Sequence, residues 1–198
     1  MARLPLPYRI GEDSGPGNAD EKIRCEVGTY AWLQEKCPSV PIPHLYGYGF
    51  TAGKEFTYLD NLPFFARNFQ RLRRWLLWVF CYPVPSFYVE NRIKDYARLG
   101  TPYMVIEYLN PSRGRMLSEI WGEGSMDPKL RTNIFHGLSR IMPTLMPTPL
   151  PKIGSFILDD NGQSSLSNRP LSLEIQQLEM EHIPVDIHRD STYLGVGS

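Results

Sequence analysis

The sequence predicts an α+β protein in which an antiparallel sheet is combined with one long helix. Three observations predict it. Residues 102–109 form an apolar run of strand length, rich in β-branched and aromatic residues and bounded by glycine and proline, which is typical of a buried strand. Residues 20–36 carry apolar side chains at helical spacing. Asn161-Gly162 separates two short apolar runs, and this dipeptide is a strong signal for a tight β-hairpin.

Composition limits the size and the class of the protein. A chain of 198 residues that is 42% hydrophobic can bury one core and part of a second. The 21 basic residues equal the 21 acidic ones, so we expect no nucleic acid partner. The three cysteines have neither paired nor zinc-type spacing, which fits a reducing compartment and a cytoplasmic location. No run approaches the roughly 18 to 20 apolar residues of a membrane span, so no transmembrane segment is expected.

The N-terminal residues 3–10 are predicted to form an edge strand. Pro5 and Pro7 cannot donate to a sheet ladder, which confines this stretch to a sheet edge or a strand entrance. Because an unpaired edge invites association, we expect self-association through this exposed edge. The loop that follows contains Gly-Pro-Gly at 15–17, but Asp20 stands where a phosphate-cradling loop requires its third glycine. We interpret it as a flexible loop.

A helix from Asp20 to about Lys36 and a strand over 41–50 come next. Asp20 is a good N-cap, and Pro38 prevents the helix from continuing beyond Cys37. Helical spacing predicts that one face of the helix is buried. That face consists of Ile23, Val27, Tyr30 and Ala31.

Residues 54–100 are less regular and are predicted to be a helical insertion. Within them, residues 64–80 alternate large apolar side chains with four arginines. We favour an amphipathic helix that buries its apolar face on its own lobe and leaves the arginines in water. The alternative is contact with a membrane surface, a nucleic acid or a partner, because basic residues beside aromatic ones also have that use.

The C-terminal half is predicted to be mostly helical with one hairpin. A short helix is expected at 117–121, and a longer one begins at Asp127-Pro128 and should end or kink at Pro143. A β-hairpin is expected over about 152–167, and a further short helix over 172–181.

Ordered blocks along nearly the whole chain resemble the fungal branch of the aminoglycoside phosphotransferase (APH) family, whose members have a protein-kinase-like fold. The blocks are Leu4–Gly11, Asp20–Glu26, Thr29–Trp32, Pro41–Pro43, Tyr103–Glu107, Leu138–Met142, Leu150–Ser155 and Asn168–Leu171. The resemblance implies a partial N-lobe at 1–109, with the insertion at about 54–100, and an incomplete C-lobe at 110–198. The strand that ends in Glu107-Tyr-Leu109 then resembles a kinase hinge strand.

The resemblance also implies a nucleotide site with ATP and Mg²⁺ as cofactors. Arg3 falls where the family places a basic residue for the nucleotide phosphates, and Glu26 falls where the first long helix offers it a carboxylate. The backbone from Glu107 to Leu109 would meet the adenine edge. Met104 would lie near the back of that pocket.

Catalytic residues and metal ligands are not assigned to this chain. In the family, the aspartate that orients the acceptor hydroxyl and the metal-binding groups lie beyond the point where this chain stops, so it is expected to be a truncated member. His188-Arg189-Asp190 spells the catalytic triplet of protein kinases, but Gly195 stands where that motif requires Asn, and only eight residues follow Asp190. We interpret the triplet as a chance match.

Two functions stay open on these grounds. The first is a phosphotransferase-family protein, whose full-length relatives transfer phosphate from ATP to an unknown hydroxyl acceptor, with this chain itself inactive. The second is a non-catalytic binding or scaffold module that uses the kinase-like lobe and the aromatic and arginine-rich segment 64–80.

Overall fold

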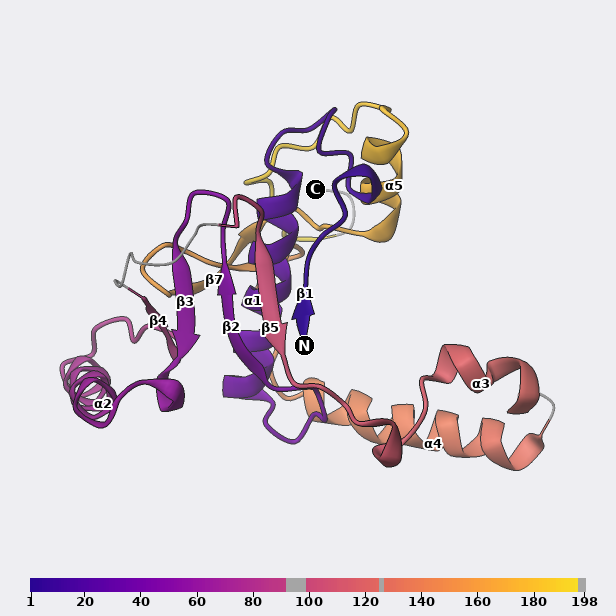
Figure 1. The fold of residues 1–198 in the computed structure, drawn as a ribbon, viewed down its shortest axis with the longest axis horizontal. Coiled ribbons are helices and arrows are strands. Elements are labelled where there is room, and N and C mark those ends of the chain that lie inside the picture. Colours follow the sequence, from indigo (N-terminus) through magenta and orange to yellow (C-terminus); the bar gives the residue numbers. More distant parts are fainter. Residues whose placement is uncertain (92–98, 125–126, 196–198) are drawn as a thin grey trace.

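The computed structural model describes residues 1–91, 99–124 and 127–195, and over these residues the fold is α+β, as predicted (Figure 1). The strands are β1 (Ala2–Arg3), β2 (Leu45–Gly49), β3 (Glu55–Tyr58), β4 (Tyr88–Glu90), β5 (Tyr103–Ile106), β6 (Ser155–Leu158) and β7 (Ser164–Asn168). The helices are α1 (Asn18–Lys36), α2 (Phe64–Val79), α3 (Leu117–Gly124), α4 (Pro128–Leu145) and α5 (Leu173–Met180). The predicted insertion also covers residues 92–98, which lie outside the described residues.

Across the described residues, five strands form an antiparallel sheet in the order β1-β5-β2-β3-β4. The predicted hinge strand, β5, therefore lies between β1 and β2, with Arg3 opposite Met104. β1 is the edge strand expected at the N-terminus, but it contains only two residues. Residues 7–9 form a 3-10 turn instead, because each proline of this stretch removes an N–H and fixes φ.

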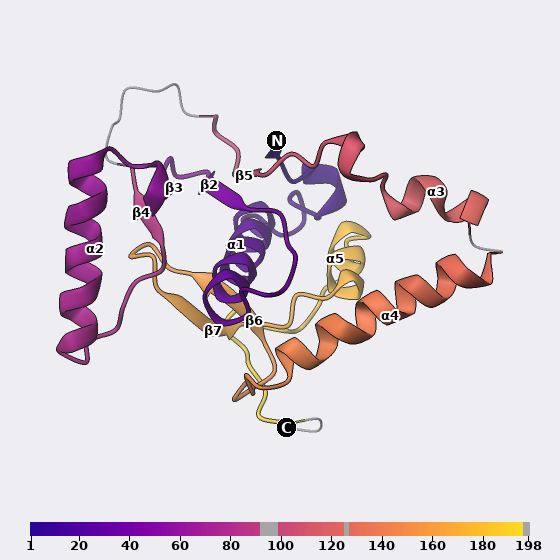
Figure 2. The same cartoon turned by 90° about the horizontal axis from the view of Figure 1, so that it is seen from below.

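Helix α1 lies between the sheet and the β6–β7 hairpin (Figure 2). Its predicted face is confirmed for Ile23, Val27 and Ala31, which are at most 1% exposed, whereas Tyr30 is only partly buried. From the other side the core receives Leu158 of the hairpin, with no exposed surface. The sheet contributes Leu45, Tyr48, Phe56, Met104 and Ile106.

The N-terminus of α1 differs from the prediction. The helix begins at Asn18 after Gly17, whose φ of 90° is left-handed, so Asp20 lies inside the first turn and is not the N-cap. The Glu12 carboxylate accepts hydrogen bonds from the backbone N–H groups of Gly17 at 2.7 Å and Ala19 at 2.6 Å. It thereby satisfies donors that a helix start leaves free. Asp20 instead accepts from the backbone N–H of Thr51 at 3.0 Å.

A buried ion-pair network connects α1 to the C-terminal segments. The Glu21 carboxylate accepts from Arg169 Nε and Nη2, both at 2.8 Å, and lies 3.0 Å from Arg189 Nε. Arg169 Nη2 also donates to Glu179 of α5 at 2.7 Å. Arg189 is the middle residue of the His-Arg-Asp triplet, and its guanidinium also donates to Asn18 Oδ1 at 2.8 Å. This arginine therefore anchors the C-terminal segment to α1.

The predicted burial of the apolar face of α2 is wrong. None of its residues is buried, and its large apolar side chains are exposed except that of Leu77, which is partly buried. The arginine side faces the protein instead, because the carboxylates of Asp60 and Glu35 lie beneath the helix and pair with Arg71 at 2.7 Å and Arg74 at 4.0 Å.

Helices α3 and α4 extend away from the sheet (Figure 1). Asp127 caps α4 by accepting from the backbone N–H of Lys129 at 2.8 Å, with Pro128 in the first turn as predicted. Pro143 does not end this helix, which continues to Leu145. The β6–β7 hairpin and α5 lie within a few residues of their predicted ranges, but the tight Asn-Gly turn is wrong: residues 159–163 join the two strands, and Gly162 adopts a positive φ of 76° whereas Asn161 does not. Within the described residues, no helix combines the length and apolar character that crossing a membrane requires.

The cysteines should differ in reactivity. Cys25 and Cys37 are buried, whereas Cys81 is exposed, and burial together with the nearby Glu21 carboxylate raises the pKa of the Cys25 thiol to about 12. Because the thiolate is the reactive form, we expect iodoacetamide at mildly alkaline pH to alkylate Cys81 alone in the native protein. In denaturant, Cys25 and Cys37 should be alkylated as well. Peptide mass spectrometry identifies the alkylated cysteines in both conditions. Native alkylation of Cys25 as fast as that of Cys81 would contradict this burial.

Candidate functional site

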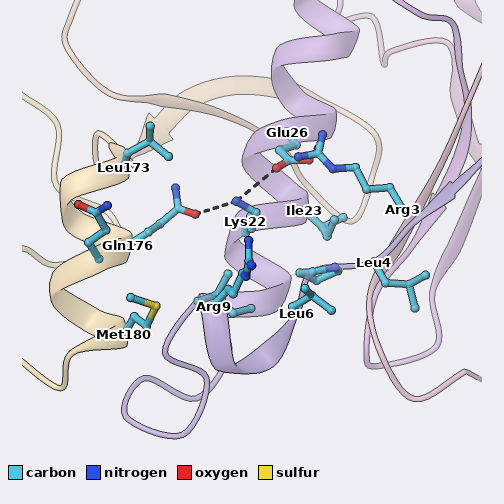
Figure 3. A pocket seen from close by; sticks show the side chains of 13 residues that line it. Arg3, Leu4, Leu6, Arg9, Lys22, Ile23, Glu26, Leu173, Gln176 and Met180 are labelled. Atoms are coloured by element: carbon cyan, nitrogen blue, oxygen red, sulfur yellow. Dashed lines mark hydrogen bonds and ion pairs between the residues drawn. The ribbon is translucent and has the colours of Figure 1, made fainter. Parts of the chain in front are cut away.

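A cavity of about 570 Å³ lies where β1 and the following turn meet α1 and α5 (Figure 3). Its cations come from three places: Arg3 ends β1, Arg9 closes the 3-10 turn, and Lys22 lies in the second turn of α1. Glu26, one turn after Lys22, supplies the only carboxylate among the lining residues of the described chain. The excess of positive charge favours an anionic ligand.

Glu26 joins the edge strand to the long helix. Its Oε2 lies 3.6 Å from Arg3 Nη1, and its Oε1 lies 3.5 Å from Lys22 Nζ. The second pair follows from helical geometry, because residues four apart in a helix are neighbours on one face. Lys22 Nζ also donates to Gln176 Oε1 of α5 at 2.7 Å, so the far wall of the cavity is fixed to the same lysine (Figure 3).

The contact between Glu26 and Arg3 does not use all of the hydrogen-bonding capacity of these two side chains. Within the described part of the chain, the buried Glu26 Oε2 accepts no hydrogen bond. The Arg3 side chain is 52% exposed. Arg3 is therefore oriented by the carboxylate while its other guanidinium N–H groups remain available to a ligand, and a planar guanidinium suits phosphate oxygens.

The cavity fits the phosphates of a nucleotide better than it fits a bare metal ion. Its volume falls in the range of about 300 to 1,000 Å³ that is usual for small-molecule sites. Among the residues that the structure describes, no group of three or more His, Cys, Asp or Glu side chains could hold a metal. Mg²⁺ usually binds proteins through one or two carboxylates together with substrate phosphates, and among the described lining residues Glu26 is the carboxylate that could take this part.

The structure brings together two of the five predicted site residues. Arg3 and Glu26 meet at the cavity, but Met104, opposite Arg3 in the sheet, has no exposed surface and packs in the core. Glu107 and Leu109 lie beyond the end of β5 and do not line the cavity. The Glu107 carboxylate accepts from the backbone N–H of His44 at 3.2 Å and lies 3.4 Å from Arg113 Nη1.

Sequence reasoning missed Arg9, Lys22 and Gln176. Lys22 could have been found, because a lysine one turn before Glu26 is a readable i, i+4 pair. Arg9 lies in a segment that was predicted to be extended. Gln176 follows Lys22 by 154 positions, and no spacing in the sequence connects the two.

Comparison with protein-family models, with curated proteins and with solved structures finds no match to this chain.

Proposed function

We propose that this protein binds the phosphates of a nucleoside triphosphate in the cavity beside β1, as a member of the kinase-like phosphotransferases that its sequence resembles. The observation that carries the proposal is the ion pair between Arg3 of the edge strand and Glu26 of α1. An oriented guanidinium beside a second cation, Lys22, is a suitable clamp for phosphate oxygens.

The sheet register supports a base subsite at a matching distance. Arg3 is opposite Met104 in the β1–β5 ladder, and Glu107 lies three positions further along the chain, just beyond the end of β5. At about 3.4 Å per strand residue, these positions are separated by roughly 10 Å. The ribose separates the base of a nucleotide from its phosphates, so the backbone at 107–109 is within reach of the base when the phosphates contact Arg3.

In this proposal, binding is not followed by transfer. An acceptor hydroxyl requires a positioned carboxylate to orient it. The only carboxylate among the described lining residues, Glu26, is already engaged by Arg3 and Lys22. The side chains of this cavity therefore hold phosphate and supply no group to activate an acceptor, which corresponds to a pseudoenzyme.

Calorimetric titration tests the proposal. ATP with Mg²⁺ and tripolyphosphate should both bind the wild-type protein, and adenosine should bind far more weakly. Arg3→Gln and Lys22→Gln should each weaken ATP binding by about 10- to 100-fold, because a hydrogen bond to a charged group contributes roughly 1.5 to 3 kcal/mol. The control is Arg140→Gln, which removes an exposed arginine from α4 and should change nothing. Equal ATP affinities for all four proteins would refute a phosphate site at this cavity.

A further inference from the structure

Helix α2 presents a regular apolar stripe to solvent. We call the stripe the α2 seam, and its exposed fractions are 85% for Phe65, 65% for Phe69, 54% for Leu72, 40% for Leu76 and 45% for Val79. The steps between these residues alternate between four and three, which is the spacing by which one helix packs along another. Phe64, Trp75, Trp78 and Phe80 are also exposed, and Trp75 and Trp78 line a hollow together with Arg71 and Arg74.

The opposite face of α2 holds the helix against its own protein. The partly buried residues of the helix are Arg67, Gln70, Arg74 and Leu77, which also follow a three-and-four spacing. Arg67 Nη1 donates to the backbone carbonyl of Asp60 at 3.4 Å, and the Arg74 guanidinium lies 4.0 Å from the centroid of the Phe87 ring. Burial lowers the pKa of Arg74. The helix therefore turns Arg67 and Arg74 toward its own protein, whereas Arg71 and Arg73 are exposed.

This orientation is the reverse of the usual one. A surface helix normally turns its apolar stripe to the core and its charged side to water, and large contiguous apolar patches on a protein surface mark interaction sites. Helix α2 lies at the periphery of the molecule, beyond β4, at the edge of the sheet farthest from β1 (Figures 1 and 2). A partner can thus approach it without meeting the rest of the fold.

We propose that the α2 seam is the interface for a second copy of this chain, with the two α2 helices packed antiparallel about a two-fold axis at Leu72. The seam is close to symmetric about this residue: Phe65 and Val79 lie seven positions on either side, and Phe69 and Leu76 lie three and four positions away. Under that axis Leu72 meets its own copy and Phe65 meets Val79, while Phe69 and Leu76 are one residue out of register with each other. The Phe65 ring thus lies opposite a smaller side chain, and a two-fold interface requires self-complementarity of this kind.

Charge favours a second copy over a lipid surface. Binding to anionic lipid would use the arginines of α2, yet Arg67, Arg71 and Arg74 contact Asp60, Glu35 or Phe87 of their own protein. The whole chain also has a formal net charge of zero. The five positions of the seam carry no charge, so two copies can meet there without repulsion.

The size of the surface predicts a weak dimer. Large aromatic side chains bury about 150 to 250 Å² each, so the exposed parts of the seam offer on the order of 500 Å² per copy. A standard stable interface buries about 800 Å² per partner, and the flanking aromatics make up part of the difference. We expect an equilibrium between monomer and dimer that depends on concentration in the micromolar range. This interface is independent of the nucleotide site.

Sedimentation equilibrium with charge-exchanged variants tests the proposal. Leu72→Glu and Leu72→Lys each place like charges opposite one another at the axis, so each variant alone should be monomeric. An equimolar mixture should recover the dimer, because Glu then lies opposite Lys. Both variants should melt like the wild type, since Leu72 is 54% exposed. The control is Leu130→Glu, which changes an exposed leucine of α4 and should leave the dimer intact.

If the dimer forms in the mixture but in neither single variant, the result supports both the α2 seam as the interface and the two-fold axis at Leu72. A wild-type protein that stays monomeric up to about 100 μM would overturn the proposal, since even a weak interface of this size should then be populated. Association that survives both Leu72 variants would also overturn it and would point to the β1 edge instead. Flotation of a monomeric wild-type protein with phosphatidylcholine–phosphatidylserine vesicles would overturn it in favour of a membrane surface.

Discussion

Replacing Glu21 by alanine should lower the free energy of unfolding by about 3 to 5 kcal/mol, because it removes a buried carboxylate that pairs with the buried Arg169 guanidinium. The Glu21 side chain is 4% exposed and accepts hydrogen bonds from Nε and Nη2 of Arg169, whose side chain is also 4% exposed. Asn168 Nδ2 donates to the same carboxylate at 2.9 Å, and Arg189 pairs with it from the C-terminal segment. The loss therefore affects three segments of the chain at once: α1, residues 168–169 and the C-terminal segment.

Urea unfolding followed by circular dichroism measures this loss. The matched control is Asp186→Ala, which removes an exposed carboxylate from a nearby loop and should leave the midpoint almost unchanged. A loss below about 1 kcal/mol for Glu21→Ala would contradict the network, because that is the value of an ordinary exposed ion pair.

Replacing Gly28 by alanine should destabilise the protein even though it improves the helix. Intrinsic propensity alone would favour alanine inside α1 by about 1 kcal/mol. A Cβ at this position, however, would lie 2.7 Å from the backbone C and O of Phe156 and 2.8 Å from the Cα of Ile157. Because backbone cannot rotate away as a side chain can, the hairpin must move off α1. Overpacking of this kind costs about 1 to 3 kcal/mol, so we expect a net loss.

Urea unfolding and tryptophan fluorescence together measure the effect of Gly28→Ala. Trp32 of α1 stacks on Phe156 with 4.9 Å between ring centroids, so displacement of the hairpin should change the Trp32 emission as well as the unfolding midpoint. The control is Gly137→Ala in α4, where a Cβ would meet no atom within 4 Å, and stability should not fall. An equal gain in both variants would mean that α1 and β6 are farther apart than the structure places them.

Elements whose signals are local were predictable from the sequence. Helix α1 was readable because Ile23, Val27 and Ala31 repeat at helical spacing, and the hairpin because Asn161-Gly162 marks a turn between two short apolar runs, although the turn itself is longer than predicted. The orientation of α2 was not readable. Its apolar stripe predicts only that something covers it, and the inward turn of Arg71 and Arg74 depends on acidic side chains from other segments.

Only the Arg3–Glu26 contact of the candidate site was predictable from the sequence. Glu26 and its contact with Arg3 were expected from the resemblance, and the structure places the two side chains together. The cavity around them depends on α5, whose Gln176 approaches Lys22 only after the chain has folded. The 3-10 turn that brings in Arg9 depends on prolines that had been interpreted as features of a strand.

Thermal unfolding with and without ATP and Mg²⁺ tests the phosphate site most directly. A ligand present at 100 times its Kd should stabilise the folded wild-type protein by about 2.7 kcal/mol, so its melting temperature should rise. In Arg3→Gln the rise should be lost or strongly reduced, while the unliganded melting temperature should stay close to that of the wild type, because a half-exposed ion pair contributes little to stability. A wild-type melting temperature that millimolar ATP leaves unchanged, or an equal rise in Arg3→Gln, would contradict the account.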